Sequence, residues 1–435
     1  MPAPARITIL AHGTRGDAQP GIALGKGLAA RGHTVTVLAS AGFEPWIRGH
    51  GLHAAPSSVD VQALMATDAG QAWSERGNKP LAQLRVMRHM LDQYGLDMAN
   101  DAYAACQGAD LIISQFTTMI YATSIAEKLG TPHMVQLLQP PVVATRHGGA
   151  MMNAPLPTRT SWINYLYAKL VFQPAIWQIY GGNASRFRRT TLGLPPQSRA
   201  QSEAEFLRVP FILCYSPSVV PPAPDWPSNV QTTGYLFLDE EGEQAWQPPD
   251  RLRSFLLAGK EQGASTISIG FGSMTGEAGK RMSQLVVEAV QRSGVRAVLL
   301  SGWAGLGDAD LPQSILCLDA APHGWLFPRI AAVVHHGGAG TTAAALRVGT
   351  PPIIVPHMAD QPFWGGRVHA LGVGPKPIPR PKLTADRLAQ AIRQAVTDPQ
   401  MAERATQLSA HIQAEDGLGN AIAAVERYLA AISSS

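Results

Sequence analysis

Short runs of β-branched and apolar residues alternate along the chain with longer segments in which apolar residues recur every three to four positions. A continuous apolar run of this kind predicts a buried strand, and the longer spacing predicts a helix. In the first half, strands are expected at 5–11, 34–39, 109–114 and 133–138. In the second half, they are expected at 266–271, 296–300, 315–318, 331–335 and 352–355. Strands that alternate with helices indicate parallel sheets covered on both faces, and hence an α/β fold.

The two series of strands are separated by a segment of different composition. Residues 221–250 are rich in proline and acidic residues, which is typical of an exposed boundary between domains. The chain has 435 residues, more than one hydrophobic core usually spans. We therefore predict two Rossmann-like domains, at 1–220 and 251–415, with a cleft between their parallel sheets. Residues 416–435 are predicted to contain a C-terminal helix that could pack back on the first domain.

Two segments allow narrower predictions about helices. A helix is expected at 19–33, with Pro20 near its start and Gly32 at its end. The segment 161–182 carries six aromatic residues. The favoured interpretation is a helical hairpin packed on its own domain. The alternatives are an apolar groove for an acceptor and a surface that dips into a lipid interface.

Composition narrows the class of protein. Apolar residues make up 46% of the chain and charged residues 15%, the balance of an ordinary globular protein. The net charge of +4 suits an anionic ligand or a negative membrane surface. Lys and Arg are not clustered as they are in nucleic-acid-binding proteins, so no nucleic-acid partner is expected.

Targeting signals and cysteine usage indicate the cellular compartment in which the protein is expected. No apolar run reaches the roughly 20 residues of a transmembrane helix, and the N-terminus lacks the pattern of a secretory leader. The three cysteines are far apart, which suits a reducing compartment and neither a disulfide framework nor a metal site. We expect a cytoplasmic protein. A peripheral contact with the inner face of the membrane and the oligomeric state stay open.

The stretch VVHHGGAGTT, residues 333–342, lies where a predicted strand meets a predicted helix. Open parallel sheets bind ligands outside the carboxyl ends of their strands, where the first turn of a helix offers unpaired N–H groups and a positive dipole end. Three glycines let this backbone approach an anion, two threonines add hydroxyl donors, and His336 could donate from its ring. The pattern predicts a phosphate or diphosphate site. A glycine-rich turn with satisfied histidines is the alternative.

Three other loops expected at the same edge of the second sheet carry compatible groups. Asp360 and Gln361 follow a strand and could bind sugar hydroxyls, or cap a helix. Ser273 could reach a phosphate, and Trp303 could cover a nucleobase or simply pack. The four loops together offer phosphate, sugar and base contacts, which predicts a nucleotide-sugar site.

The stretch HHGGAGTTAAALRVGTPPIIVPHMADQPFWGGRV (335–368) resembles the donor-binding signature of GT-B nucleotide-sugar glycosyltransferases, within the family of sterol and antibiotic glycosyltransferases. GTRGDAQP (13–20) resembles the N-terminal hallmark of this group, and DWPSNVQTTGYLFLD (225–239) its interdomain segment. The likeness spans nearly the whole chain and is faint from about 55 to 210, where acceptors bind in this family. It implies an inverting transfer from a UDP-sugar, most often UDP-glucose, to a hydroxyl of a lipophilic acceptor, without a metal.

The family pattern assigns the general base to Asp17, in the loop after the first strand. An aspartate has a reference pKa of about 3.9, so it serves as a base if burial raises its pKa or if proton transfer comes late. Its alternative role is to cap the following helix. His12, in the same loop and expected to titrate near neutrality, is the second candidate. Plant relatives pair a histidine base with an aspartate, but SQF at 114–116 supplies no such carboxylate, which favours Asp17 alone.

Further site residues follow from these loops and from the resemblance. The donor-binding candidates are Arg15, Gly16, Ser273, Trp303, Ala321, His336, Gly338, Ala339, Gly340, Thr341, Thr342, Asp360 and Gln361. The acceptor-binding candidates are Trp162, Tyr165, Phe172, Trp177, Phe116 and Gln115. No acidic pair of the DxD type stands at a predicted strand end, so no metal is predicted, and the helix dipole with neutral donors would replace it.

Three other functions can be compared with the transferase. A nucleotide-sugar epimerase could use the same architecture, but the long aromatic segment favours a reaction with an acceptor. A dehydrogenase is disfavoured because the first strand is followed by HGTRGDAQP and not by G-x-G-x-x-G. A non-catalytic protein that binds a UDP-sugar is the third alternative, and the presence of Asp17 disfavours it.

Overall fold

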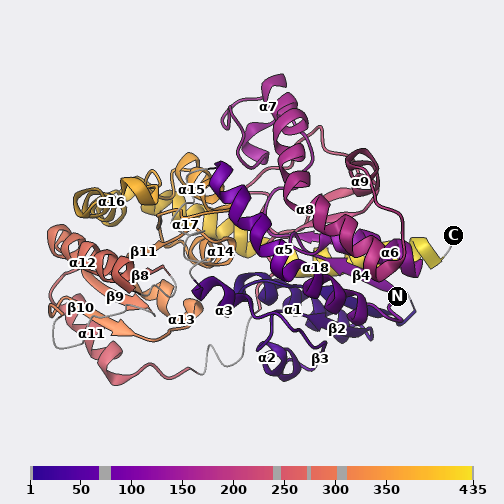
Figure 1. Ribbon diagram of the computed structural model, residues 1–435. Coiled ribbons are helices and arrows are strands. Elements are labelled where there is room, and N and C mark those ends of the chain that lie inside the picture. The colour runs from indigo at the N-terminus through magenta and orange to yellow at the C-terminus, as the bar shows by residue number, and fades with distance from the viewer. Residues whose placement is uncertain (1–2, 68–79, 239–245, 272–275, 301–310, 434–435) are drawn as a thin grey trace. The chain divides into compact units, whose positions relative to one another are not determined.

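The computed structural model describes residues 3–67, 80–238, 246–271, 276–300 and 311–433 (Figure 1). The chain divides into two compact units. The first comprises residues 1–238 together with 415–435, and the second comprises 239–414. Each unit contains one parallel sheet with helices on both faces, which confirms the α/β fold predicted from the alternating pattern.

The sheet of the first unit has its strands in the order β3-β2-β1-β4-β5-β6-β7, and all are parallel. The strands are β1 (Arg6–Leu10), β2 (Thr34–Leu38), β3 (His53–Ala54), β4 (Leu111–Ser114), β5 (His133–Leu137), β6 (Phe211–Leu213) and β7 (Val230–Thr232). In the central strands β-branched side chains lie side by side, so Ile9 is flanked by Val37 and Ile113. The strand order reverses between β1 and β4, and the carboxyl ends of these two strands form a switch point.

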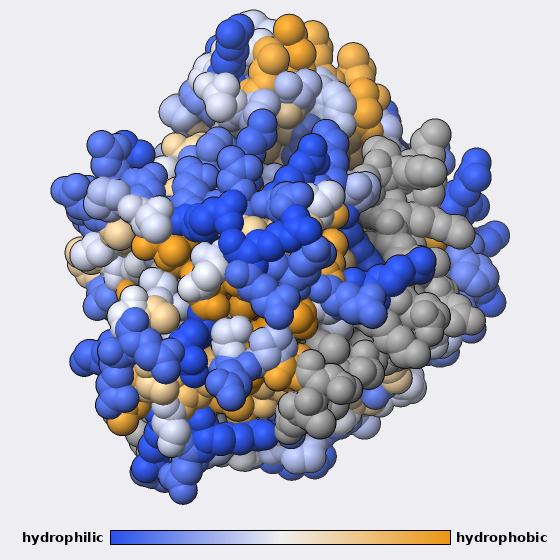
Figure 2. All heavy atoms as spheres, turned by 90° about the vertical axis from the view of Figure 1, so that its left-hand side faces the viewer, coloured by the Kyte–Doolittle hydropathy of each residue, from blue (hydrophilic) through white to orange (hydrophobic). Residues whose placement is uncertain are grey.

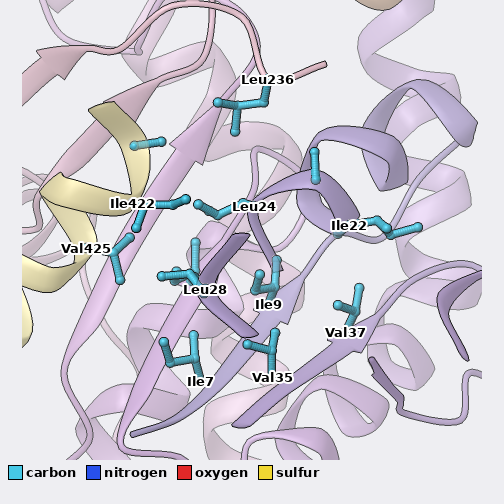
Figure 3. Packing of buried hydrophobic residues seen from close by; sticks show 14 of the residues in the cluster. Ile7, Ile9, Ile22, Leu24, Leu28, Val35, Val37, Leu236, Ile422 and Val425 are labelled. Carbon is cyan, nitrogen blue, oxygen red and sulfur yellow. The ribbon is translucent and has the colours of Figure 1, made fainter. Parts of the chain in front are cut away.

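Helices cover both faces of this sheet. They are α1 (Arg15–Ala30), α2 (Glu44–Gly49), α3 (Val61–Ala66), α5 (Pro80–Ala105), α6 (Met119–Leu129), α7 (Trp162–Tyr167), α8 (Gln173–Phe187), α9 (Arg199–Phe206) and α18 (Gly417–Ser433). The C-terminal helix α18 packs on α1, where Ile422 and Val425 join Leu24 and Leu28 in one core (Figure 3). Gly27 permits this approach, because a Cβ there would lie 2.5 Å from Cδ1 of Ile422.

The second unit has its strands in the order β10-β9-β8-β11-β12, again all parallel. The strands are β8 (Thr266–Gly270), β9 (Arg296–Leu300), β10 (Ile315–Leu318), β11 (Ala332–His335) and β12 (Pro352–Ile354). The helices are α11 (Asp250–Glu261), α12 (Gly276–Ser293), α13 (His323–Leu326), α14 (Ala339–Arg347), α15 (Gln361–Ala370), α16 (Ala385–Thr397) and α17 (Pro399–Ala414). Ala297 and Leu299 pack against α12 and α16, whereas Val298 and Leu300 pack against α11. The switch point of this sheet lies between β8 and β11.

All nine predicted strands are present, each within two residues of its predicted limits. The strands β3 (HA) and β7 (VQT) were not predicted, because their residues form no apolar run, and the apolar strand β6 (FIL) was missed. The predicted start of the first helix at residue 19 was wrong, since α1 begins at Arg15. Thr14 and Asp17 form a capping box that starts the helix one turn earlier, and Pro20 lies inside it.

The helical hairpin favoured for 161–182 was also wrong. One continuous helix runs through α7, a π-helical turn at Ala168–Phe172, α8 and a second π-helical turn at Arg188–Leu192. Ala168 and Gln173, at the junctions, keep right-handed helical dihedrals, so the chain does not reverse. Pro174 is the second residue of α8, two positions after the first π-helical turn, whose wider geometry accommodates a residue without an N–H. None of the helices in the described residues is long and apolar enough to cross a membrane.

Candidate active site

The turn between β11 and α14 stands at the switch point of the second sheet. Gly337 has a φ of +94°, and a Cβ at this position would lie 2.6 Å from Cγ2 of Ile354, so the turn requires glycine on both counts. Gly338 is the N-cap of α14. The N–H groups of the first helical turn, residues 339–341, have no acceptor within the helix and stand at the positive end of its dipole. This geometry suits a phosphate group.

The two histidines of this turn differ in their surroundings. His335 is buried at the end of β11, and its Nδ1 accepts the N–H of Gly337 at 3.0 Å, which holds the turn. His336 is half-buried, and its Nδ1 makes no hydrogen bond to any residue that the structure describes. Burial lowers the pKa of His336, so its ring is neutral near pH 7 and can donate one hydrogen bond. His336 is therefore the histidine of the pair that can serve a ligand.

The loop after β12 is held by its own side chains. Oε1 of Gln361 accepts the N–H of His357 at 2.8 Å and that of the next residue at 3.0 Å. This leaves the amide NH₂ of Gln361 as the group that could meet a ligand. Oδ2 of Asp360 accepts the indole N–H of the buried Trp364 at 2.7 Å. Ala359 has a φ of +53°, which is unfavourable for an L-residue, and such positions cluster at functional sites.

The remaining donor candidates differ in how the structure places them. The hydroxyl of Thr342 is buried and donates to the N-cap carbonyl of α14 at 2.8 Å, whereas Thr341 is half-buried. Ala321 follows the edge strand β10 and is buried. Ser273 and Trp303 lie outside the described residues. The donor-binding roles of all these residues stay predictions.

Asp17 lies at the switch point of the first sheet, in the first turn of α1. Its Oδ2 accepts the backbone N–H of Thr14 at 2.8 Å and the hydroxyl of Thr14 at 3.0 Å. Burial raises the pKa of Asp17, and the hydrogen bonds from Thr14 oppose that effect. Asp17 therefore caps the helix and is also a stronger base than an exposed aspartate. The T-x-x-D spacing is the sequence signal by which Thr14 could have been found.

Two buried glutamines hold the backbone beside Asp17. Nε2 of Gln115 donates to the carbonyl of Asp17 at 3.0 Å and to Oε1 of Gln136 at 3.1 Å. Nε2 of Gln136 in turn donates to the carbonyl of Pro20 at 3.3 Å. The acceptor-binding role predicted for Gln115 stays a prediction, and in this structure its amide NH₂ supports the backbone at Asp17. Gln136 was not predicted, because an isolated glutamine within a strand gives no signal in the sequence.

Of the other three candidates in this loop, His12 and Arg15 have partners of their own. His12 is fully buried, and its Nε2 lies 3.0 Å from Oγ of Ser57. Burial lowers its pKa to about 4, so the expectation that His12 titrates near neutrality was wrong. The guanidinium of Arg15 lies 4.8 Å from the ring centre of Trp46, in a cation–π contact. Gly16 is exposed in the first turn of α1.

The acceptor candidates fall into two groups. Phe116 follows β4, next to Gln115, and its ring packs edge-on against Tyr180 of α8 at 6.3 Å. Trp177 lies one turn earlier on α8, over Gly181, where a Cβ would lie 2.5 Å from the indole. The other candidates lie at the start of the long helix, and they are Trp162, which is exposed, and Tyr165 and Phe172, which are half-buried. The described residues contain no group of three or more His, Cys, Asp or Glu side chains that could hold a metal ion.

Two family models match the chain, one in each half. Residues 7–146 match the glycosyltransferase family 28 N-terminal domain. Residues 298–422 match the C-terminal domain of erythromycin biosynthesis protein CIII-like proteins. The first match contains the Asp17 loop, and the second contains the β11–α14 turn and the loop after β12. The chain belongs to the GT-B glycosyltransferase family.

Individual proteins are similar to nearly the whole of this chain. The chain is 38% identical over 434 residues to a sterol 3-beta-glucosyltransferase of Aspergillus fumigatus, and the match covers 98% of this chain and 30% of the relative. A sterol 3-beta-glucosyltransferase of Emericella nidulans is also 38% identical, with the same coverage. The chain therefore spans about a third of the length of these curated relatives. Among solved structures, the glycosyltransferase of kitacinnamycin has the same fold, with a TM-score of 0.69 at 20% identity, covering 98% of this chain and 99% of the other.

Proposed function

We propose that this chain is an inverting, metal-independent glycosyltransferase that moves a hexose from a UDP-sugar, with UDP-glucose as the favoured donor, to a hydroxyl of a lipophilic acceptor. The observation that carries the proposal is the half-buried carboxylate of Asp17, whose pKa is raised by burial, at the switch point of the first sheet. The sterol glucosyltransferases among its relatives favour a sterol-like acceptor.

The reaction needs a base and a site for the leaving group. Asp17 takes the proton of the acceptor hydroxyl while the acceptor oxygen bonds to the anomeric carbon. The bond from that carbon to the UDP oxygen breaks on the opposite face, so the configuration inverts. The negative charge that develops on the diphosphate is stabilised by the N–H groups at the start of α14 and by a neutral His336. Neutral donors and a helix dipole replace a divalent cation in this scheme.

The direct test is release of UDP from UDP-glucose by the purified chain, with a panel of lipophilic alcohols and with or without EDTA. The proposal expects release that depends on one class of alcohol and is unaffected by EDTA. Loss of activity in EDTA with recovery on Mg²⁺ would overturn metal independence. Conversion of the donor sugar to its epimer without any acceptor would point to an epimerase.

Two variants separate the catalytic role of Asp17 from its capping role. Asp17→Asn keeps an oxygen that can accept the N–H of Thr14 but removes the base, so transfer should fall by at least about 10²-fold while UDP binding stays. Thr14→Ala removes one hydrogen bond to the carboxylate and costs about 1 kcal/mol of stability. Because that bond lowers the pKa of Asp17, Thr14→Ala should move the acidic limb of the kcat/KM profile to higher pH. Turnover of Asp17→Asn near the wild-type level would place the base elsewhere.

A further inference from the structure

The start of the long helix carries a cluster of exposed apolar side chains. Five of the seven large apolar residues exposed in the described part of the chain fall within ten consecutive positions. We call them the α7 patch, and its members are Trp162, Ile163, Leu166, Leu170 and Val171, with exposed fractions of 62%, 56%, 50%, 72% and 49%. Figure 2 shows apolar residues gathered at the top of the molecule, at the level of α7 in Figure 1. An exposed apolar cluster of this kind marks an interaction surface.

The opposite face of this helix is already occupied. Nδ2 of the buried Asn164 donates to the carbonyls of Arg146, Leu156 and Arg159 at 2.8–3.1 Å. The buried Ala168 packs beside Met151. These contacts fix the rotation of the helix about its axis. The α7 patch is therefore held outward and cannot turn onto its own unit.

The chain segment that carries the α7 patch contains basic residues and no acidic ones. From residue 128 to residue 202 the chain contains eight Lys and Arg and no Asp or Glu. Lys169 lies within the patch helix, and Arg159 is exposed in the loop that Asn164 holds. The guanidinium of Arg146 lies 5.1 Å from the ring centre of Trp162, although Asp225 pairs with it at 3.5 Å. Apolar and aromatic side chains flanked by cations are the chemistry of a helix that lies in the interface of an anionic bilayer.

We propose that the α7 patch docks this chain on the surface of an anionic phospholipid bilayer, with its apolar side chains in the interfacial region and Arg159 and Lys169 at the lipid phosphates. A second copy of the chain fits this surface poorly, because a two-fold contact would bring the same cations of both copies together. The proposal goes beyond the transferase activity and does not depend on it. It would bring the protein to the phase in which a lipophilic acceptor dissolves.

The test is sedimentation of the full chain with vesicles, read as bound protein and not as turnover. One set of vesicles contains equal parts of phosphatidylcholine and phosphatidylserine, and the other contains phosphatidylcholine alone. The patch variant is Leu170→Ser, and the matched control is Leu257→Ser on α11, an equally apolar residue with an exposed fraction of 57%. Both side chains are exposed, so thermal unfolding should show both variants folded.

The wild type should sediment with the anionic vesicles, more weakly with neutral ones and more weakly at high salt. Leu170→Ser should lower the partition constant about tenfold and Lys169→Gln several-fold, whereas Leu257→Ser should leave it unchanged. No sedimentation of the wild type, or equal losses for Leu170→Ser and Leu257→Ser, would overturn the proposal. A dimer in light scattering that Leu170→Ser dissociates, without vesicle binding, would assign the α7 patch to a second copy instead.

Discussion

Replacement of Gly337 by alanine would test the turn on which the proposed phosphate site rests. Gly337 has a φ of +94°, and a Cβ there would lie 2.6 Å from Cγ2 of Ile354 and 3.3 Å from the backbone oxygen of Gln361. Ile354 is 1% exposed within β12, so it has little room to withdraw. Alanine at this position is therefore unfavourable for two reasons: the positive φ disfavours an L-residue, and the added methyl group would clash with the packed strand β12.

Two energetic costs determine how much Gly337→Ala destabilises the protein. The left-handed conformation costs an L-residue about 1–2 kcal/mol, and an extra methyl group in a packed core costs about 1–3 kcal/mol. The sum of about 2–5 kcal/mol is a large part of the roughly 5–15 kcal/mol by which native proteins are stable. For a unit of this length, each 1 kcal/mol lowers the unfolding midpoint by about 2–4 °C. Gly337→Ala should therefore lower the midpoint of the second unit by about 4–20 °C.

The assay is thermal unfolding followed by circular dichroism, with UDP binding measured on the same preparations. Gly366→Ala is the matched control, because Gly366 lies within α15 and a Cβ there would meet nothing within 4 Å. Alanine at that helical position should stabilise the protein by up to about 1 kcal/mol. If the free energy of unfolding of Gly337→Ala lies within about 0.5 kcal/mol of the wild-type value, neither the dihedral angle nor the close contact constrains the turn. That result would refute the reasoning.

Three further predictions concern ionisation and the donor. Burial lowers the pKa of His133 and of His357 to about 3, so below about pH 6.5 the unfolded chain binds protons that the folded chain does not. Each of these histidines should therefore lower the free energy of unfolding by about 2 kcal/mol between about pH 7 and pH 5. A thermal unfolding midpoint that stays constant over that range would contradict this prediction. By calorimetry, His336→Gln, which keeps a neutral donor, should hold UDP affinity within a few-fold, whereas His336→Ala should lose about tenfold, and equal affinities would remove His336 from the site. Asp360→Ala should weaken binding of a UDP-sugar more than binding of UDP in a competition assay, and equal losses would argue against a sugar contact.

The strands were predictable because their pattern is local. In β11 and β12 the apolar runs are continuous, and glycine or proline marks the turns that follow, so each element is evident without knowledge of its neighbours. The β11–α14 turn was predictable for the same reason, since a glycine such as Gly337 indicates a turn with a positive φ, which few other residues adopt. The continuous helix through Pro174 was missed because proline usually ends a helix, and the π-helical turn that accommodates it leaves no clear pattern.

The surroundings of the site residues were not predictable, because they depend on contacts between distant segments. The raised pKa of Asp17 follows from burial, and its backbone is supported by Gln115, which follows β4 and is 98 residues away, together with Gln136 in β5. His12 was expected to titrate near neutrality, and only its burial beside Ser57 shows that it does not. A pKa records the solvent and the charges around a group, and tertiary packing decides both.

The sequence by itself determined the order of strands and helices, the glycine turn, the loops that carry the candidate chemistry and the family to which the chain belongs. These follow from residue type and spacing, which act over a few positions. The tertiary structure decided the strand order that creates each switch point, which of His335 and His336 is available to a ligand, and which face of the long helix stays exposed. Those properties arise when segments far apart in the chain exclude water from one another, and no local pattern records which segments will meet.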